Sequence, residues 1–223
     1  MPNDLSPSRV PDMTRDQLVA RIAAAQAERG RRGGGVIGRR GDHTLAGEEF
    51  RPRGPLVPAA VLVPLVARDD GYTVLLTQRA ASLRDHAGQI SFPGGRIEVA
   101  DHSPEHAALR EAREEIGLPS ELVEIVGRLD TYEVRTGYEV TPVIGMVAPP
   151  FELAIDMTEV AEAFEVPLSF VLDAANHERH SREIAGKPRE FWVLPWQDRY
   201  IWGATAGMLV NLYEVLAGSS RHT

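Results

Sequence analysis

The stretch AALREAREEIGL, Ala107 to Leu118, decides how the rest of this sequence is interpreted. In a helix, Glu111 lies three positions from Glu114 and four from Glu115, so the three carboxylates are expected on one solvent-facing side, opposite an apolar side. Like charges at these spacings oppose helix formation by roughly 0.2–0.5 kcal/mol per pair. A hard cation is the natural compensation, and closely set carboxylate oxygens suit Mg²⁺ or Mn²⁺.

The residues around this run predict a capped helix that follows a glycine turn. SFPGG, Ser91 to Gly95, is a short apolar step into a turn, and Ser103 with Pro104 supplies an N-cap and a first-turn proline. Gly117 is the expected C-terminal stop. An isolated acidic run would indicate a solvated helix face with ion pairs. Combined with the turn and the capped helix, it indicates a site for phosphate and metal.

Part of this run matches a known motif. REAREEIGL, Arg110 to Leu118, resembles the REUxEExGU half of the Nudix box, in which U is apolar, and Gly95 resembles the leading glycine of that box. The box has a glutamate at the sixth position after this glycine and the arginine at the fourteenth. Here Arg110 stands at the fifteenth, and the nearest acids are Glu98 and Asp101. One extra loop residue explains the difference.

A second signature overlaps the first. LLTQRAASLRDHAGQISFPGG, Leu75 to Gly95, is similar to the pattern LLTxR followed by LRxHxGQxxFPGG, which marks the coenzyme A pyrophosphatase branch of the Nudix hydrolases. The resemblance implies a role in substrate binding or site architecture for the polar residues of the pattern, namely Arg79, Arg84, His86 and Gln89. Arginine suits phosphate recognition through its forked hydrogen bonding. Gly94, with Gly95, is expected to let the backbone turn closely around the metal and the phosphate.

The same resemblance assigns roles on the acidic helix. Glu111, Glu114 and Glu115 are the expected metal ligands beside Gly95, and Glu114 and Glu115 match the metal-binding pair of the family. Arg110 is expected to pair with Glu114 at the i+4 spacing and to set its direction. Pyrophosphate cleavage then needs divalent ions that neutralise the phosphate oxygens and help to form hydroxide from water.

The general base is open at this stage. One of the box glutamates could act as the base, or an acid from the distant segment TEVAEAFEVPL, in which Glu159 and Glu162 are the candidates. A second interpretation, equally supported, is that these two acids are exposed charges on a short helix or loop.

Hydrophobic patterns predict a mixed α/β protein. Ala59–Arg68 and Tyr72–Arg79 are expected to form a hairpin, later strands follow the acidic helix, and Ala204–Gly218 is expected to be an amphipathic closing helix. The resemblance implies a Nudix-type α/β/α sandwich with a mixed β-sheet. We expect residues 1–12 to be a disordered tail and residues 13–223 to form a single Nudix hydrolase domain with an N-terminal helix.

The N-terminal helix is predicted from a capping box, Thr14 with Gln17, and is expected to end at Gly30. The basic, glycine-rich segment Arg29–Asp42 lacks the lysine and hydroxyl residue that end a phosphate-binding P-loop. A flexible linker is the main interpretation of this segment, and contact with a phosphorylated substrate is a minor hypothesis.

Composition excludes several classes of protein. The net charge of −8 over 223 residues argues against a partner that is nucleic acid or an anionic membrane. The absence of cysteine excludes disulfides, thiolate metal sites and cysteine nucleophiles. No apolar run approaches membrane-spanning length, so a cytoplasmic enzyme is expected. Trp192, Trp196 and Trp202 lie in predicted strands and are expected in the core or an interface.

These observations lead to three hypotheses about function. The first is a Mg²⁺- or Mn²⁺-dependent hydrolase that splits coenzyme A (CoA) or acyl-CoA into 3′,5′-ADP and a 4′-phosphopantetheine moiety, with homodimerisation plausible from the resemblance. The second keeps the chemistry but takes ADP-ribose, NADH or another nucleoside diphosphate derivative. The third is a catalytically silent ligand-binding module, which the complete glutamate set argues against.

Overall fold

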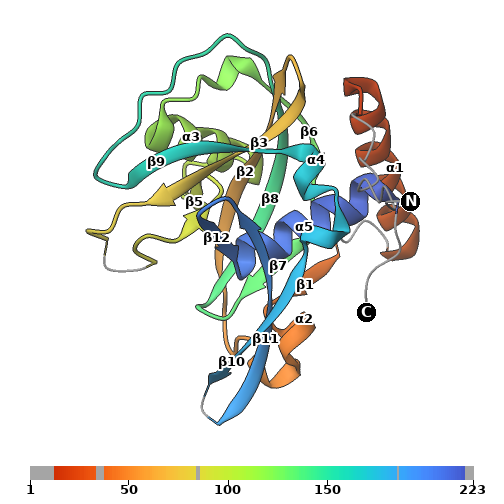
Figure 1. Ribbon diagram of the computed structural model, residues 1–223, viewed down its shortest axis with the longest axis vertical. Helices are drawn as coiled ribbons and strands as arrows, with labels where there is room; N and C mark the ends of the chain where they lie inside the picture. Colours follow the sequence, from red (N-terminus) through yellow and green to blue (C-terminus); the bar gives the residue numbers. More distant parts are fainter. Residues whose placement is uncertain (1–12, 34–37, 84–85, 185, 219–223) are drawn as a thin grey trace, which may run out of the picture.

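The structure, a computed structural model, describes residues 13–33, 38–83, 86–184 and 186–218 (Figure 1). Within these residues, nine strands form one mixed sheet and three form a smaller antiparallel sheet. The mixed sheet contains β1 (Arg39–Gly41), β2 (Val57–Arg68), β3 (Gly71–Arg79), β4 (Ile90–Ser91), β5 (Gly94–Arg96), β6 (Val123–Arg128), β7 (Thr131–Val134), β8 (Tyr138–Val147) and β9 (Val160–Pro167). The small sheet contains β10 (Glu178–Ile184), β11 (Lys187–Trp196) and β12 (Arg199–Trp202). The helices are α1 (Arg15–Gly33), α2 (His43–Ala46), α3 (Pro104–Ile116), α4 (Leu168–Val171) and α5 (Ala204–Ala217).

Strand β2 lies inside the mixed sheet and is covered on both faces. It pairs in parallel with β8 and antiparallel with β3. Its side chains alternate between two cores, Val63 and Leu65 entering one and Leu62 and Val66 the other. A strand covered on both sides needs a nearly continuous apolar run, and the sequence of β2 has one. The predicted strand and its hairpin partner β3 are confirmed.

Helices lie on both sides of this sheet (Figure 1). Helix α3 contributes Ala108, Ala112 and Ile116 to one core, and α1 and α5 contribute Leu18 and Leu209 to the other. The predicted α/β class, with a mixed sheet inside an α/β/α sandwich, is therefore confirmed.

Helix α3 begins and ends where the sequence predicts. The hydroxyl of Ser103 accepts a hydrogen bond from the backbone N–H of His106 (3.2 Å), and Pro104 is the first helical residue. Gly117 adopts a left-handed conformation (φ 66°) that ends the helix. The helix packs directly on β2 and β5, and its second half, which carries Glu111 and Glu115, lies beside the glycine turn.

Helix α5 differs from the amphipathic helix that we expected. Most of its side chains are buried, including the polar Thr205 and Asn211. The helix contacts α1 and β7 as well as strands β11 and β12 of the small sheet, so little of it meets water. Hydrogen bonds satisfy the buried polar groups: Thr205 Oγ1 donates to the carbonyl of Ile90 (2.9 Å), and Asn211 Oδ1 accepts from the N–H of Asp130 (2.9 Å).

The N-terminal helix has the predicted capping box. The N–H of Thr14 donates to Gln17 Oε1 (2.9 Å), and the N–H of Gln17 donates to Thr14 Oγ1 (3.3 Å). The predicted end at Gly30 is wrong, because α1 continues to Gly33. The linker predicted for Arg29–Asp42 is wrong for residues 29–33, which continue α1, and for residues 39–41, which form β1 and pair in parallel with β7. Residues 34–37 of this segment lie outside the described residues.

Two further expectations concern domains and membranes. The tail predicted for residues 1–12 lies outside the described residues, and the single domain over residues 13–223 stays a prediction. In the part of the chain that the structure describes, no helix is long and apolar enough to cross a membrane.

Arg40 connects β1 to the interior. Its Nε donates to Asp130 Oδ2 (2.8 Å), and its Nη2 forms an ion pair with Glu214 of α5. The three side chains are almost inaccessible to water, with exposed fractions of 13%, 2% and 4% for Arg40, Asp130 and Glu214. Removal of one member of such a buried group weakens the compensation of the remaining buried charges.

We therefore expect Arg40→Gln to lower the free energy of unfolding by about 3–5 kcal/mol. Chemical denaturation measures this quantity. The matched control is Arg39→Gln, because the side chain of Arg39 is 55% exposed although it pairs with Glu133 and Glu139. Its effect is expected to stay within about 1 kcal/mol. Equal losses in the two variants would contradict the anchoring role of Arg40.

Candidate active site

The turn Pro93–Gly95 lies tightly against β2. Gly94 and Gly95 pair with Val61 and Ala60, and the carbonyl of Pro93 accepts a hydrogen bond from Leu62 N–H (2.9 Å). A Cβ atom on Gly94 would lie 2.4 Å from the carbonyl oxygen of Ala60. Only glycine permits this approach of the two backbones.

The next glycine makes room for a carboxylate of α3. A Cβ atom on Gly95 would lie 2.4 Å from Glu111 Oε1 and 2.5 Å from Glu111 Cδ. The Glu111 side chain therefore occupies the space that a larger residue at position 95 would need. Loss of water around this half-buried carboxyl raises its pKa, and the nearby charges of Glu114 and Glu159 raise it further, against the opposing effect of Arg110.

Glu115 lies deeper in the same site. Its Oε2 accepts a hydrogen bond from Gly94 N–H (3.2 Å), and Arg79 Nη1 lies 3.9 Å from its Oε1. Glu115 is 4% exposed, and burial raises the pKa of its carboxyl to about 8. The expectation that all three glutamates face solvent is therefore wrong for Glu115. The side of α3 that carries it packs against β5, whereas the side chain of Glu114 remains 60% exposed.

Arg110 holds the acidic side chains in place. The predicted pair with Glu114 is present, at 3.0 Å between Nη1 and Oε2. The same nitrogen lies 2.9 Å from Glu111 Oε1, and Nη2 donates to the carbonyl of Arg96 (3.1 Å). One guanidinium group thus sets the directions of two carboxylates and contacts the end of β5.

Asp101 completes this arrangement, and the sequence left its role open. Its carboxylate accepts two hydrogen bonds from Arg110, at 3.1 Å from Nε and 2.9 Å from Nη2. It also accepts one from the N–H of Glu98 (2.8 Å) and lies 2.8 Å from His106 Nδ1. The Arg110 guanidinium holds the pKa of Asp101 well below its usual range. Of the two nearby acids, Asp101 orients Arg110 and Glu98 faces solvent.

The residues of the second signature meet at one cleft of about 530 Å³, which also includes Gly94 and Gly95. Arg79, His86 and Gln89 line it, whereas Arg84 lies outside the described residues. The N–H of Arg79 donates to the carbonyl of Gln89 (2.9 Å), and His86 Nδ1 lies 2.8 Å from Gln89 Oε1. Within the described residues, the buried Nε of Arg79 has no hydrogen-bond partner, so it can donate to a ligand.

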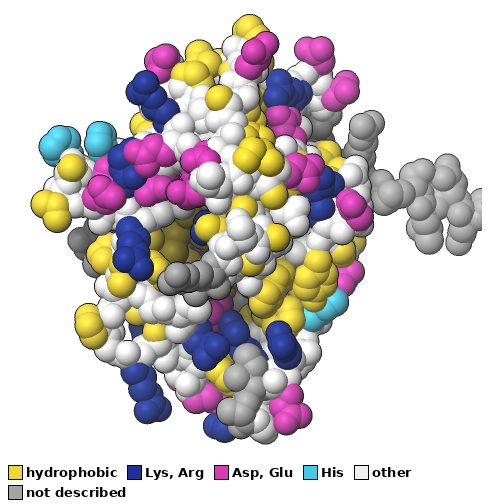
Figure 2. All heavy atoms as spheres, turned by 90° about the vertical axis from the view of Figure 1, so that its left-hand side faces the viewer, with side chains coloured by type: hydrophobic (Ala, Val, Ile, Leu, Met, Phe, Trp, Pro, Cys, Tyr) yellow, Lys and Arg dark blue, Asp and Glu magenta, His cyan; other side chains and the backbone are white. Residues whose placement is uncertain are grey.

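The floor of the cleft is apolar. Ala59, Val61, Val140 and Met208 line it, and Trp202 joins them from β12. The core position expected for Trp202 is thus wrong, because the small sheet brings this residue to the cleft, and the interface position stays a prediction. Figure 2 shows a hollow with apolar atoms at its floor, acidic side chains gathered above it and basic side chains below it.

The two candidate bases have different surroundings, and neither lies on a helix. Glu159 directly precedes β9 and is exposed, and its charge raises the pKa of both Glu111 and Glu115. Glu162 lies within β9, where its Oε1 is 2.5 Å from Arg199 Nη2. The structure therefore brings Glu159, but not Glu162, to the acidic end of the site.

The donor set fits a hard divalent cation. Glu111 and Glu115 offer carboxylate oxygens beside two glycines, and the partly desolvated Glu115 is only weakly compensated by Arg79. Among the described residues, no three acidic or histidine side chains converge into a preformed cage. Mg²⁺ does not require one, because it commonly takes one or two carboxylates and completes its shell with water and substrate phosphate.

Comparison with known proteins establishes the family. Residues 56–185, more than half of the chain, match the NUDIX domain, and the chain therefore belongs to the Nudix family. Nudix hydrolases cleave pyrophosphate bonds and generally use divalent metal ions.

The chain is also similar to curated relatives. A protein of Enterobacter sp. (strain 638), described as uncharacterized Nudix hydrolase NudL, is 42% identical over 154 residues, which is 69% of this chain and 80% of the relative. The NudL protein of Klebsiella pneumoniae (strain 342) is 37% identical over 183 residues, which is 77% of this chain and 95% of the relative.

Solved structures are more distant. A MutT/nudix family protein from Enterococcus faecalis has a TM-score of 0.47 and 18% identity, covering 74% of this chain and 63% of that chain. A binary complex of the C. elegans Ap4A hydrolase has a TM-score of 0.43 and 22% identity, covering 49% of this chain and 80% of that chain. Similarities at this level do not bear on the ligand.

The contact between Gly95 and Glu111 gives a first prediction for the site. We expect Gly95→Ala to lower the free energy of unfolding by about 1–3 kcal/mol, because the new methyl group would displace the Glu111 carboxylate. In a Glu111→Ala background the same change should cost much less. Chemical denaturation of the two single variants and the double variant measures the coupling. Additive losses would show that Glu111 does not occupy this space.

The raised pKa of Glu115 predicts a pH dependence in metal-free buffer. The folded state holds the proton up to about pH 8, whereas the unfolded chain releases it near the usual value of 4.5, so this residue destabilises the fold progressively as the pH rises between those values. Glu115→Gln should therefore be more stable than the parent by about 2–4 kcal/mol at pH 8 and nearly equal at pH 4.5. Denaturation in chelator at both pH values tests this, with the exposed Glu114→Gln as control. A pH-independent difference would refute the assignment.

Proposed function

We propose that this chain is a divalent-metal-dependent pyrophosphohydrolase that splits CoA or acyl-CoA into 3′,5′-ADP and (acyl-)4′-phosphopantetheine. The proposal is supported by one observation, that two groups of residues lie together in the cleft. Arg79, His86 and Gln89, which belong to the CoA pyrophosphatase signature, lie in the same cleft as the glycine turn that contacts Glu111 and Glu115.

The acidic side of the site supplies the metal-binding groups of this proposal. Glu111, Glu114 and Glu115 would hold Mg²⁺ or Mn²⁺ beside Gly95. A bound divalent ion neutralises phosphate oxygens and lowers the pKa of a bound water. Arg110 keeps Glu111 and Glu114 in position and is itself oriented by Asp101.

The remaining steps fall to residues of this chain. Arg79 would bind a phosphate oxygen of the diphosphate through its free Nε. Glu159, whose charge acts on both Glu111 and Glu115, would accept the proton of the attacking water. The water oxygen bonds to one phosphorus atom, the P–O bond from that phosphorus to the bridging oxygen breaks, and the bridging oxygen leaves with the other phosphate. Each product thus keeps one of the two phosphates of the cleaved diphosphate, and 3′,5′-ADP keeps its 3′-phosphate as well.

Other nucleoside diphosphate derivatives, such as ADP-ribose and NADH, share the diphosphate and could use the same acidic end. A silent binding module would need the cleft but not the carboxylates. The cluster of Glu111, Glu114 and Glu115, with Arg110 held against it, therefore favours hydrolysis.

Mass spectrometry of the products tests the proposal. The purified protein is incubated with CoA, ADP-ribose or NADH in Mg²⁺ or Mn²⁺. We expect metal-dependent formation of 3′,5′-ADP and 4′-phosphopantetheine from CoA, with Glu114→Gln and Glu115→Gln each reducing the rate at least about 100-fold. Glu162→Gln is the matched control, because its carboxylate pairs with Arg199 away from the acidic end, and we expect a much smaller loss.

The outcomes separate the three hypotheses. Cleavage of ADP-ribose or NADH alone would retain the hydrolytic site and reject CoA as substrate. A folded, metal-loaded protein that cleaves none of the three would favour the silent module.

A further inference from the structure

The lining of the cleft has a strongly positive character in a protein of net charge −8. Among the described residues that line it, one is acidic, Asp42, and four are arginines: Arg79, Arg96, Arg135 and Arg189. Arg79 reaches Glu115 at the acidic end, but the diphosphate there does not account for the other arginines. Their positions indicate a second anion site.

The strand register separates Arg135 from the glycine turn. Gly95 pairs with Ala60 of β2, whereas Tyr138, which follows the β7–β8 turn, lies opposite Val57. Three residues along a strand span about 10 Å. Arg135, in that turn, therefore lies toward the far end of the cleft from the acidic site, with the apolar floor between them.

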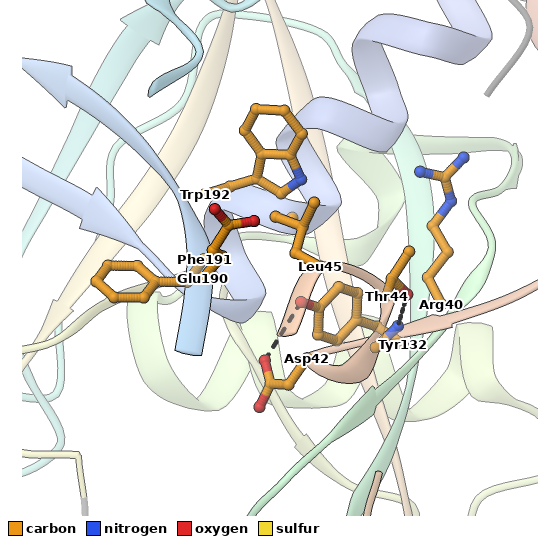
Figure 3. A pocket seen from close by; sticks show the side chains of 10 residues that line it. Arg40, Asp42, Thr44, Leu45, Tyr132, Glu190, Phe191 and Trp192 are labelled. Atoms are coloured by element: carbon orange, nitrogen blue, oxygen red, sulfur yellow. Dashed lines mark hydrogen bonds between the residues drawn. The ribbon is translucent and has the colours of Figure 1, made fainter. Parts of the chain in front are cut away.

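The guanidinium group of Arg189 has a fixed position at this end. Its Nη2 lies 2.8 Å from Asp42 Oδ2, its side chain is 12% exposed, and its buried Nε has no hydrogen-bond partner within the described residues. The Asp42 carboxylate also accepts hydrogen bonds from the N–H of Arg135 (2.9 Å) and from Tyr132 Oη (3.3 Å). Figure 3 shows Asp42 and Tyr132 pointing toward each other. The negative charge of Asp42 is thus offset by groups of the protein itself, and its carboxylate positions Arg189.

Arg135 supplies a cation that is not already paired. Its side chain is exposed, and its guanidinium group has no hydrogen bond or ion pair to any residue that the structure describes. The backbone N–H of Arg135 donates to Asp42, which fixes the point at the cleft from which the Arg135 side chain extends.

We propose that Arg135 and Arg189, held by Asp42, bind a phosphomonoester group of the substrate, distinct from the diphosphate that is cleaved. Two guanidinium groups suit a dianionic phosphate through forked, charge-assisted hydrogen bonds. The apolar floor between the two ends would contact the nucleoside. The substrate class is therefore a nucleoside diphosphate derivative that carries a third phosphate on the nucleoside.

This inference rests on the proposed function and narrows the class of substrates that the enzyme would accept. CoA carries such a phosphate on its ribose, whereas ADP-ribose and NADH do not. Arg135 lies inside residues 56–185, the part that matches the NUDIX domain, whereas Asp42 and Arg189 lie outside it, so this subsite combines a turn of that domain with segments beyond it.

Steady-state kinetics with CoA and dephospho-CoA, which lacks only the phosphomonoester, tests the subsite. We expect the parent protein to prefer CoA in kcat/KM by tenfold or more. Arg135→Ala should reduce that preference about tenfold, chiefly through KM for CoA, and Arg135→Lys should restore part of it. Arg189→Lys retains the charge beside Asp42 and should also reduce the preference, because the fork is lost. Arg31→Ala, an exposed arginine on α1, is the matched control and should leave the preference unchanged.

A binding measurement separates this inference from the proposed function. Calorimetric titration with 3′,5′-ADP and 5′-AMP requires no turnover, and tighter binding of 3′,5′-ADP that is lost in Arg135→Ala would support the subsite even without hydrolysis. Equal cleavage of CoA and dephospho-CoA, with equal binding of the two nucleotides, would overturn the subsite while leaving the hydrolase assignment intact. An equal effect of Arg135→Ala on both members of each pair would overturn it as well.

Discussion

The Glu115 carboxylate lies almost out of contact with water, and its surroundings determine how the site is assembled. A buried carboxyl needs hydrogen bonds or a cation, and here it receives one N–H from Gly94 and a distant guanidinium from Arg79. This incomplete compensation raises its pKa. It also requires the glycine turn to lie directly over α3, which the close pairing of β5 with β2 achieves.

Arg110 has the complementary role on the more exposed side of the helix. It is held by Asp101, whose side chain is fully buried, and it contacts Glu111 and Glu114. The acidic end thus has two layers, in which Asp101 and Arg110 orient the carboxylates that would meet the metal. Because the Arg110 guanidinium offsets the charges of Glu111 and Glu114, these two acids share the more exposed side of the helix at a smaller electrostatic cost.

The local features of the fold could be predicted from sequence, because capping residues, glycine stops and strand alternation act over short distances. Ser103, Gly117 and the β2–β3 hairpin are examples. The inward orientation of Glu115 could not be derived in this way, because i+4 spacing defines a side of the helix but not what packs against it. The prediction that α5 is amphipathic was wrong for the same reason. The small sheet covers a second side of this helix, and the position of that sheet cannot be inferred from the hydrophobic period of the helix.

The arrangement of arginines at the far end of the cleft is even harder to predict from the sequence. Arg135, Arg189 and Asp42 come from a hairpin turn, the small sheet and the end of β1, and no motif connects them in the chain. Position 42 reaches the cleft because β1 pairs with β7, and Arg40 on that strand is tied to Asp130 and Glu214.

The two ends of the cleft therefore differ in how evolution can change them. The glycine turn and the acidic helix occupy one short contiguous stretch, between Gly94 and Glu115, whose members contact one another directly. The far end is assembled from separate segments, and among the described residues no hydrogen bond joins the acidic helix to Asp42, Arg135 or Arg189. An insertion or exchange in the small sheet can consequently reshape the far end of the cleft while the glycine turn and the acidic helix stay unaltered, so related proteins can inherit the same acidic end with different pockets beside it.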